Sequence, residues 1–255
     1  MDQRAGRRFL LGLSPWLGAL ALWYAVRWSG FVNASLIPAP HQVAAKFVEL
    51  LLHEGLLVDI FASTRRVLLG VILGIAVAVP VGFLLGWYRP ARTFADPMIN
   101  FFRALPPIAL IPLVIVYFGV DELAKLVILF YASFFSGVIV MYEGVSQITP
   151  LYIRVAKTLG ANEFEIFRKV IIPLTVPHIL TALRVALGVA WATLVASELI
   201  AAPTGLGRMM QVATQFLQTD RIVVGIIMIG LLGFLMDRLL LWSERRLTAW
   251  QEVRA

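Results

Sequence analysis

Three ionisable residues lie inside or beside long apolar stretches, where a charge is costly and is therefore a candidate for function. Arg103 directly precedes one apolar run, Arg184 lies inside another, and Glu198 follows the end of that second run. An arginine in such a position can bind or steer an anion, and a carboxylate can pair with it. The alternative is that each residue pairs with an opposite charge or a helix-end carbonyl and only positions helices.

The sequence offers no group of residues for catalysis or for a metal site. His41, His53 and His178 are scattered, and cysteine is absent, which excludes thiolate ligands and cysteine nucleophiles. No Ser/His/Asp arrangement or carboxylate pair can be assembled. The glycines of residues 203–207 follow no strand, so we expect a turn there and no phosphate site. The chain itself is therefore not expected to be an enzyme.

The composition places these residues in a membrane protein. Of the 255 residues, 60% are hydrophobic and only 15% are charged, and the mean hydropathy is +0.86. A protein surrounded by water cannot cover its surface with so few charged and so many hydrophobic residues. The net charge of +7 is carried by short clusters between apolar runs. This distribution fits loops that flank membrane spans and argues against binding of nucleic acid.

Six apolar runs are long enough to cross a bilayer. They cover residues 9–26, 67–88, 104–120, 126–142, 179–197 and 222–242. We therefore expect a single all-α, polytopic membrane domain over residues 1–255. The first run also fits a signal peptide, but its length and the aromatic residues at its end favour a retained anchor. The third run contains Pro106, Pro107 and Pro112, which predict a broken helix that lines protein or a cavity.

Two further patterns concern helix packing. In the second run, glycines recur at four-residue steps or multiples of them and predict the close approach of another helix. They are Gly70, Gly74, Gly82 and Gly86. Before this run, apolar residues within 43–51 have helical spacing, which fits either an amphipathic helix on the outer face or a solvated loop helix.

Lysine and arginine counts predict the orientation. With a cytoplasmic N-terminus, the connecting segments hold twelve of these residues inside and six outside. Cytoplasmic segments of membrane proteins carry the excess of positive charge. We therefore expect both termini in the cytoplasm, although the Arg65 and Arg66 pair runs against the bias.

The longest polar interval on the cytoplasmic side, residues 143–176, has the pattern of two short helices. Residues 152–159 have helical composition and stop at Gly160, a residue suited to the left-handed conformation that ends a helix. Asn162 can cap the next helix, and Glu165 can complete a capping box three positions later.

The second of these helices carries an apolar stripe. Phe164, Phe167, Val170 and Ile171 recur at helical spacing, and Pro173 is expected to end or kink the segment. A stripe outside the bilayer must be buried on something. Periodicity alone leaves two candidates open, a partner protein and the spans of the chain itself.

The loop resembles the signature loop of ABC importer permeases, which reads Glu-Ala-Ala, three residues, Gly, nine residues, Ile-x-Leu-Pro. Ala156, Gly160 and Pro173 match this pattern, whereas Arg154 and Val155 replace its Glu and Ala. The likeness extends over most of the chain and is strongest for the sulfonate, taurine and nitrate branch. The segments that carry it are residues 36–40, 102–112 and 245–250, with 194–200 and 205–207 most like the taurine permeases.

The resemblance implies a type I ABC importer permease fold with about six transmembrane helices in the bacterial inner membrane. It implies import of a small anion, with taurine or another sulfonate expected and nitrate or bicarbonate as alternatives. The implied partners are a second permease copy, two ABC ATPase subunits, an external solute-binding protein and membrane lipid. The implied ATPase-docking residues are Arg154, Ala156, Lys157, Thr158, Leu159, Gly160, Ala161, Phe164 and Pro173.

We expect ATP and Mg²⁺ on the ATPase subunits and no cofactor on this chain, because its sequence lacks a Gly-x-x-x-x-Gly-Lys-Ser/Thr loop. The residues expected along the translocation path are Arg103, Pro106, Pro107, Arg184, Trp191 and Glu198. The rival class is an ion-coupled secondary transporter. That class predicts mid-span carboxylates and an inverted repeat, and the first two runs show neither.

Overall fold

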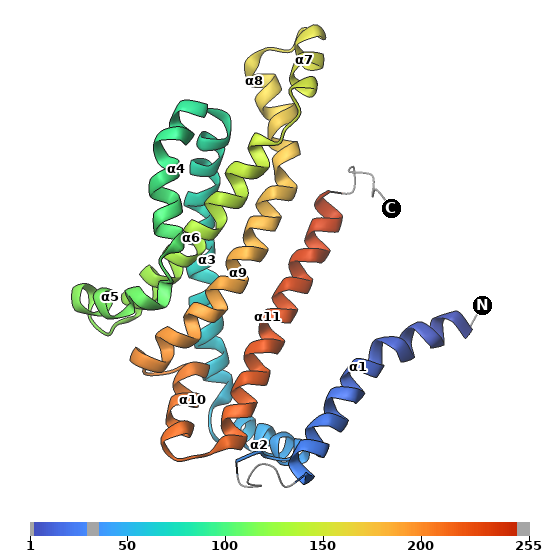
Figure 1. Cartoon of the computed structure of the whole chain (residues 1–255), viewed down its shortest axis with the longest axis vertical. Coiled ribbons are helices and arrows are strands. Elements are labelled where there is room, and N and C mark those ends of the chain that lie inside the picture. Colours follow the sequence, from blue (N-terminus) through green and yellow to red (C-terminus); the bar gives the residue numbers. More distant parts are fainter. Residues whose placement is uncertain (1–2, 30–35, 249–255) are drawn as a thin grey trace.

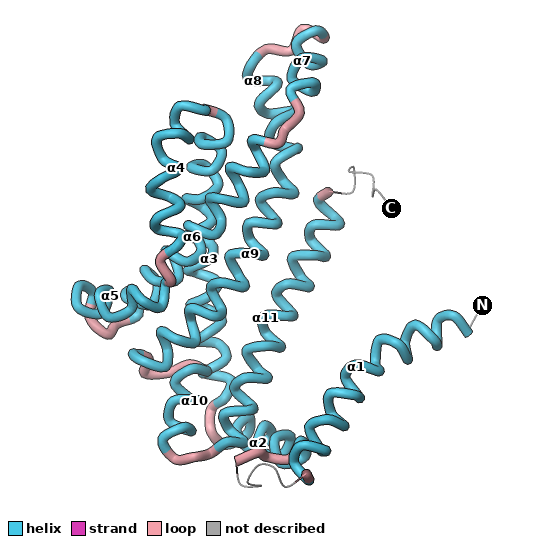
Figure 2. The backbone as a smooth tube through the Cα atoms, viewed as in Figure 1, coloured by secondary structure: helices cyan, strands magenta, loops and turns pink. Residues whose placement is uncertain are grey.

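The computed structural model describes residues 3–29 and 36–248, and every regular element in these ranges is helical (Figures 1 and 2). Three long helices form the core. They are α3 (Leu56–Trp87), α6 (Glu122–Ser146) and α9 (Ile172–Ala201), and each packs against the other two. The predicted all-α class is confirmed.

The remaining helices lie along this core or at its ends (Figure 1). α11 (Thr219–Leu247) runs beside α9. α7 (Pro150–Thr158) and α8 (Glu163–Ile166) form one end of the bundle, and α2 (Pro40–His53) and α10 (Leu206–Gln215) form the other. The predicted loop 143–176 is therefore separated from α2 by the whole length of the bundle.

Four described helices are long and apolar enough to cross a membrane, namely α3, α6, a continuous helix from Glu163 to Ile200, and α11. They correspond to four of the predicted runs, and each is longer than its run because charged residues extend it at one or both ends. These runs are 67–88, 126–142, 179–197 and 222–242. The predicted first span, residues 9–26, falls in α1 (Gln3–Trp28), but the side chains of residues 3–13 lie outside the described part.

The predicted third span, residues 104–120, coincides with the second half of a bent pair of helical segments. α4 (Arg89–Ala104) and the segment Pro107–Phe118 form a pair bent by 83°, which would be one broken span or a re-entrant loop. The second half consists of a 3-10 turn, η1 (Pro107–Leu110), and α5 (Ile111–Phe118). The predicted break is confirmed, because Pro106 and Pro107 hold the junction extended. Its first half, however, precedes the predicted run.

The amphipathic segment before α3 is packed. Val43 and Leu50 of α2 are buried in a cluster with Leu56, Val224 and Met228. The helix is amphipathic, as the sequence predicted, and its apolar face packs on the chain's own bundle, which excludes the solvated loop helix.

The contact between α3 and α6 depends on glycine. A Cβ placed on Gly70 would lie 2.4 Å from the Cβ of Leu129, and one on Gly82 would lie 2.4 Å from the Cβ of Met141. Both distances are too short for two carbon atoms. The predicted close approach of a helix along this stripe is confirmed, because only glycine lets the two backbones come so near.

We expect Gly82→Ala to lower the free energy of unfolding by about 1–3 kcal/mol, since the new methyl group must push two packed helices apart. Besides Met141, it would meet the Val138 carbonyl oxygen at 2.9 Å. Denaturant unfolding of the purified chain in detergent measures the change. Gly188→Ala on α9 is the matched control, because a Cβ there meets nothing within 4 Å. Equal losses in the two variants would contradict this account.

Candidate functional site

The first helix of the loop ends at glycine, as the sequence predicted. Gly160 has φ +81°, and its N–H donates to the carbonyl of Lys157 at 3.0 Å. The N–H of Ala161 donates to the carbonyl of Ala156 at 3.0 Å. These two bonds form a Schellman motif, which satisfies the last carbonyls of α7 and turns the chain sharply into α8.

The second helix starts with the predicted capping box. Asn162 Oδ1 accepts from the Glu165 N–H at 2.8 Å, and the Asn162 N–H donates to Glu165 Oε2 at 3.2 Å. Lys169 also pairs with Glu165 at 3.0 Å. Both ends of the turn between α7 and α8 are therefore fixed by local hydrogen bonds.

The second helix of the loop does not end at Pro173. α8, a π-helical turn η2 (Phe167–Ile171) and α9 form one continuous helix from Glu163 to Ile200, 38 residues long. Proline is tolerated near the start of α9, and the wider turn before it accommodates the missing N–H. The sequence predicted that Pro173 would either end or kink the helix, and a helix end is excluded. The loop is instead continuous with a membrane-spanning helix.

The apolar stripe is divided between two environments. Ile166 and Ile171 are buried with Ala156, and the Phe167 ring packs edge-on against Phe83 of α3, with centroids 5.3 Å apart. Ile171 of the stripe is thus buried on the chain itself, one of the two open interpretations, whereas Phe167 contacts Phe83 but stays 41% exposed. Ala156 is only 9% exposed, because its methyl group packs inside the loop, so it offers little surface for docking.

Phe164, the first residue of the stripe, faces outward and is 70% exposed. Leu159, at the C-cap of α7, is 82% exposed. Arg154, Lys157, Thr158 and Gly160 are also exposed, whereas Ala161 and Pro173 are half-buried. We call Leu159 and Phe164 the exposed apolar pair. Large apolar side chains held outside the bundle on a rigid turn are suited to binding another protein.

A pocket of about 300 Å³ lies at the break between α4 and α5 and is bounded by α6 and α9. Arg103 and Pro107, two of the residues predicted for the translocation path, line it. Pro106 precedes η1 at the same break. The hydroxyl of Tyr131 donates to the Phe102 carbonyl and ties the end of α4 to α6.

Two other residues predicted for the path lie between α9 and α11. Arg184 pairs with Asp237 at 2.8 Å and approaches Glu244 at 3.7 Å. Trp191 is buried, and a Cβ placed on Gly233 of α11 would lie 3.7 Å from its indole ring. The structure thus gives Arg184 the carboxylate partner that the sequence left as an alternative.

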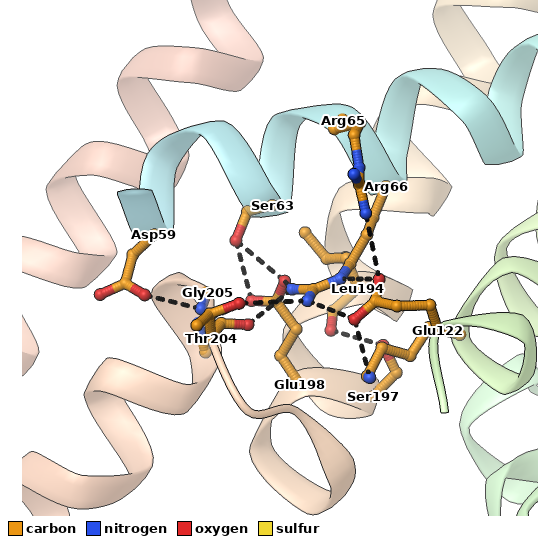
Figure 3. Close-up of polar contacts among 12 residues, drawn as sticks. Asp59, Ser63, Arg65, Arg66, Glu122, Leu194, Ser197, Glu198, Thr204 and Gly205 are labelled. Atoms are coloured by element: carbon orange, nitrogen blue, oxygen red, sulfur yellow. Dashed lines mark hydrogen bonds and ion pairs between the residues drawn. The ribbon is translucent and has the colours of Figure 1, made fainter. Parts of the chain in front are cut away.

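Glu198, the last residue predicted for the path, lies in an ion cluster near the end of the bundle formed by α2 and α10 (Figure 3). Arg66, Lys125 and Glu198 of this cluster are buried, whereas Glu122 is 45% exposed. The Glu198 carboxylate is inaccessible and accepts from Arg66 Nη1 at 2.6 Å. Arg66 Nε and Nη2 donate to the two oxygens of Glu122 at 2.7 and 2.6 Å. Lys125, also buried, pairs with Glu122 at 3.2 Å. The cluster joins α3, α6 and α9.

The loop before α10 wraps around this cluster. The Thr204 carbonyl accepts from Arg66 at 2.6 Å, and the Gly207 N–H donates to Glu198 at 2.9 Å. Ser63 donates to Glu198 at 2.9 Å. A side chain on Gly205, with φ +131°, would lie 2.5 Å from the Glu198 carboxylate. The predicted turn at residues 203–207 therefore has a packing role, because its glycines let the backbone reach a buried charge.

Sequence reasoning missed Arg66, Ser63, Glu122 and Lys125. α3 begins at Leu56, eleven residues before the predicted run, so Arg66 lies within the helix and not in an external loop. The available signal was the Arg65 and Arg66 pair, which contradicted the charge bias of external segments. An arginine that breaks this bias can be explained by a buried partner.

Comparisons with known proteins agree with this arrangement. Residues 70–249 match the family described as the binding-protein-dependent transport system inner membrane component. The chain is 50% identical over 230 residues to a protein of Brucella abortus (strain 2308) described as a probable ABC transporter permease, covering 90% of this chain and 91% of that protein. It is 34% identical over 249 residues to the taurine transport system permease protein of Escherichia coli (strain K12), covering 96% of this chain and 90% of that protein.

A solved structure has a similar fold. The MetNI methionine ABC transporter in an inward-facing conformation matches with a TM-score of 0.58 and 20% sequence identity, over 72% of this chain and 94% of that chain. At this identity the likeness concerns the fold alone.

Proposed function

Because the chain belongs to the family of binding-protein-dependent transport system inner membrane components, we propose that it imports a small organic sulfonate as one half of a homodimer. It is an ABC importer permease of the taurine, sulfonate and bicarbonate branch, a multi-pass inner-membrane transport component and not an enzyme. As such a permease it works with ATPase and binding-protein partners. This membership excludes the ion-coupled secondary transporter.

The observation that carries the proposal is the exposed apolar pair and its connection to the membrane. Leu159 and Phe164 flank a turn whose two ends are fixed by hydrogen bonds, and the helix that begins at Glu163 continues to Ile200. We assign this pair to a groove on an ATPase subunit, one for each permease copy. ATP and Mg²⁺ bind to those subunits, because this sequence has no phosphate-binding loop.

The proposed cycle follows from this connection. ATP draws the two ATPase subunits together, and each docked loop moves with its subunit. The helices continuous with the loops then rock between outward-facing and inward-facing arrangements. ATP drives this change only if the ATPase–permease complex binds it more tightly in one arrangement than in the other, since equal affinity shifts nothing.

The orientation is proposed from the same geometry. The loop lies in the cytoplasm with its ATPase partner, so α2, α10 and the ion cluster lie toward the external binding protein. α11 runs from α10 back toward the loop end, which supports a cytoplasmic C-terminus (Figure 1). α1 meets α2 at its C-terminal end, which supports a cytoplasmic N-terminus. Exposed apolar side chains around the bundle contact lipid.

The proposed substrate rests on the relatives. The likeness to a taurine permease over almost the whole chain supports taurine or another sulfonate. Specificity is shared with the external binding protein, which selects the solute before the permease receives it.

The test is reconstitution of the chain with its natural ATPase and binding protein in liposomes. We expect uptake of labelled taurine or ethanesulfonate that requires ATP and the loaded binding protein. Uptake driven by a proton or sodium gradient without the ATPase would contradict the importer assignment. Uptake of nitrate or bicarbonate in place of sulfonates would contradict only the proposed substrate.

A further inference from the structure

The pocket at the break between α4 and α5 lies at the middle depth of the bundle. Its lining includes Tyr131 and Ser136, which are near the centre of α6, and Val185 and Val189, which are near the centre of α9. With a volume of about 300 Å³ it is at the lower end of the range for small-molecule sites.

Among the described residues, Arg103 is the only charged one that lines this pocket. Within the described residues it has no ion pair and no side-chain hydrogen bond. Arg66 and Arg184, by contrast, each bind a carboxylate. The Arg103 side chain is exposed, and a guanidinium at membrane depth is stabilised by a counter-charge. The described part of this chain supplies none, so an anion from solution can take that place.

The two hydroxyl groups of the pocket are already engaged as donors. Tyr131 donates to the Phe102 carbonyl, and Ser136 donates to the Ala132 carbonyl at 2.7 Å. The Arg103 guanidinium is thus the main free donor on the wall, and the rest of the wall is mostly apolar. One charge-assisted contact holds an anion briefly, which suits a site from which the anion must leave.

We propose that this pocket is the transient substrate site, where Arg103 binds the head group of a small monovalent oxyanion of the alkanesulfonate class. The fork of the guanidinium matches two oxygens of such a head group, and a short carbon chain lies against the apolar wall. In the part of the chain that the structure describes, no carboxylate lines the pocket to pair with an ammonium group. A simple alkanesulfonate therefore fits it better than a zwitterion does. The inference rests on the proposed import function and assigns its site.

The experiment uses the complete complex in liposomes and compares Arg103→Gln with Arg89→Gln. Arg89 is exposed at the opposite end of α4 and is the matched control. We expect Arg103→Gln to reduce ethanesulfonate uptake per ATP hydrolysed by about tenfold or more, the effect of losing one charge-assisted contact. ATP hydrolysis stimulated by the loaded binding protein is expected to persist. Arg89→Gln is expected to transport like the unaltered complex.

A second variant tests the pocket without touching the charge. Val189→Phe adds volume to the wall of the pocket and is expected to reduce ethanesulfonate uptake similarly. If Arg103→Gln fails to assemble with the ATPase, Val189→Phe alone tests whether the pocket is the substrate site. Uptake at the unaltered level in an assembled Arg103→Gln complex, or in Val189→Phe, would overturn the site. If the unaltered complex imports no sulfonate, the proposed function fails instead, so the two failures are distinguishable.

Discussion

Replacing Glu198 by alanine will lower the free energy of unfolding by about 3–5 kcal/mol, because it leaves a buried guanidinium without one of its partners. Arg66 is 5% exposed and Glu198 is fully buried. The substitution also removes the acceptor for Ser63 and for the Gly207 N–H. Three long helices and the loop before α10 lose their common contact. Denaturant unfolding in detergent measures the loss.

Asp237→Asn is the matched control for this prediction. Asp237 also pairs with an arginine, Arg184, but both side chains are at least one-third exposed. This pair is less enclosed by protein and joins only α9 and α11, so the control should lose less than Glu198→Ala. Glu198→Gln keeps the size of the side chain and one acceptor oxygen. Its loss in free energy of unfolding should therefore fall between those of Glu198→Ala and Asp237→Asn. A loss for Glu198→Ala no larger than that for Asp237→Asn would show that the ion cluster does not hold the helices together.

Replacing Leu159 by aspartate will weaken association with the ATPase by about 30-fold or more, corresponding to the loss of about 2 kcal/mol at a central interface contact. Leu159 makes little contact with its own chain, being 82% exposed, so the fold of the loop should survive. A charge placed in an apolar groove of the partner must be desolvated without a counter-ion. Co-purification of the ATPase at graded concentrations measures the change.

Leu247→Asp provides the control for the docking prediction. Leu247 is an exposed leucine at the end of α11 and lies outside the predicted docking residues. It should leave ATPase association unchanged. Arg154→Glu, which restores the glutamate of the family pattern, should also assemble. If Leu159→Asp and Leu247→Asp retain the ATPase equally, the exposed apolar pair is not the docking surface.

The turn between α7 and α8 could be predicted from sequence because its determinants are neighbours in the chain. Gly160 supplies the left-handed residue, and Asn162 and Glu165 form the capping box within four positions. Which apolar residues face outward could not be predicted. Ala156 lies in α7 and Leu159 is its C-cap, and only the first is buried, because it packs with Ile166 and Ile171 of the following helical segment.

The ion cluster could not be predicted because its members meet only in the folded chain. Arg66 and Glu198 are 132 residues apart. Hydropathy also placed the start of the second span after Arg66, since charged residues end an apolar run even where the helix continues. The break at Pro106 and Pro107 was predictable from proline stereochemistry. The position of α4 was not, because its many polar residues hide a helix that packs beside α3 and α6.

The continuous helix from Glu163 to Ile200 has the geometry of a long lever arm. Its 38 residues span about 57 Å at the usual rise, and a tilt of about 5° at one end displaces the other by about 5 Å, close to the pitch of one helical turn. A partner that rotates the exposed apolar pair by only a few degrees can thus produce a displacement large enough to repack side chains around Glu198. Small angular changes at the nucleotide-binding subunits would then suffice to operate the opposite side of the membrane.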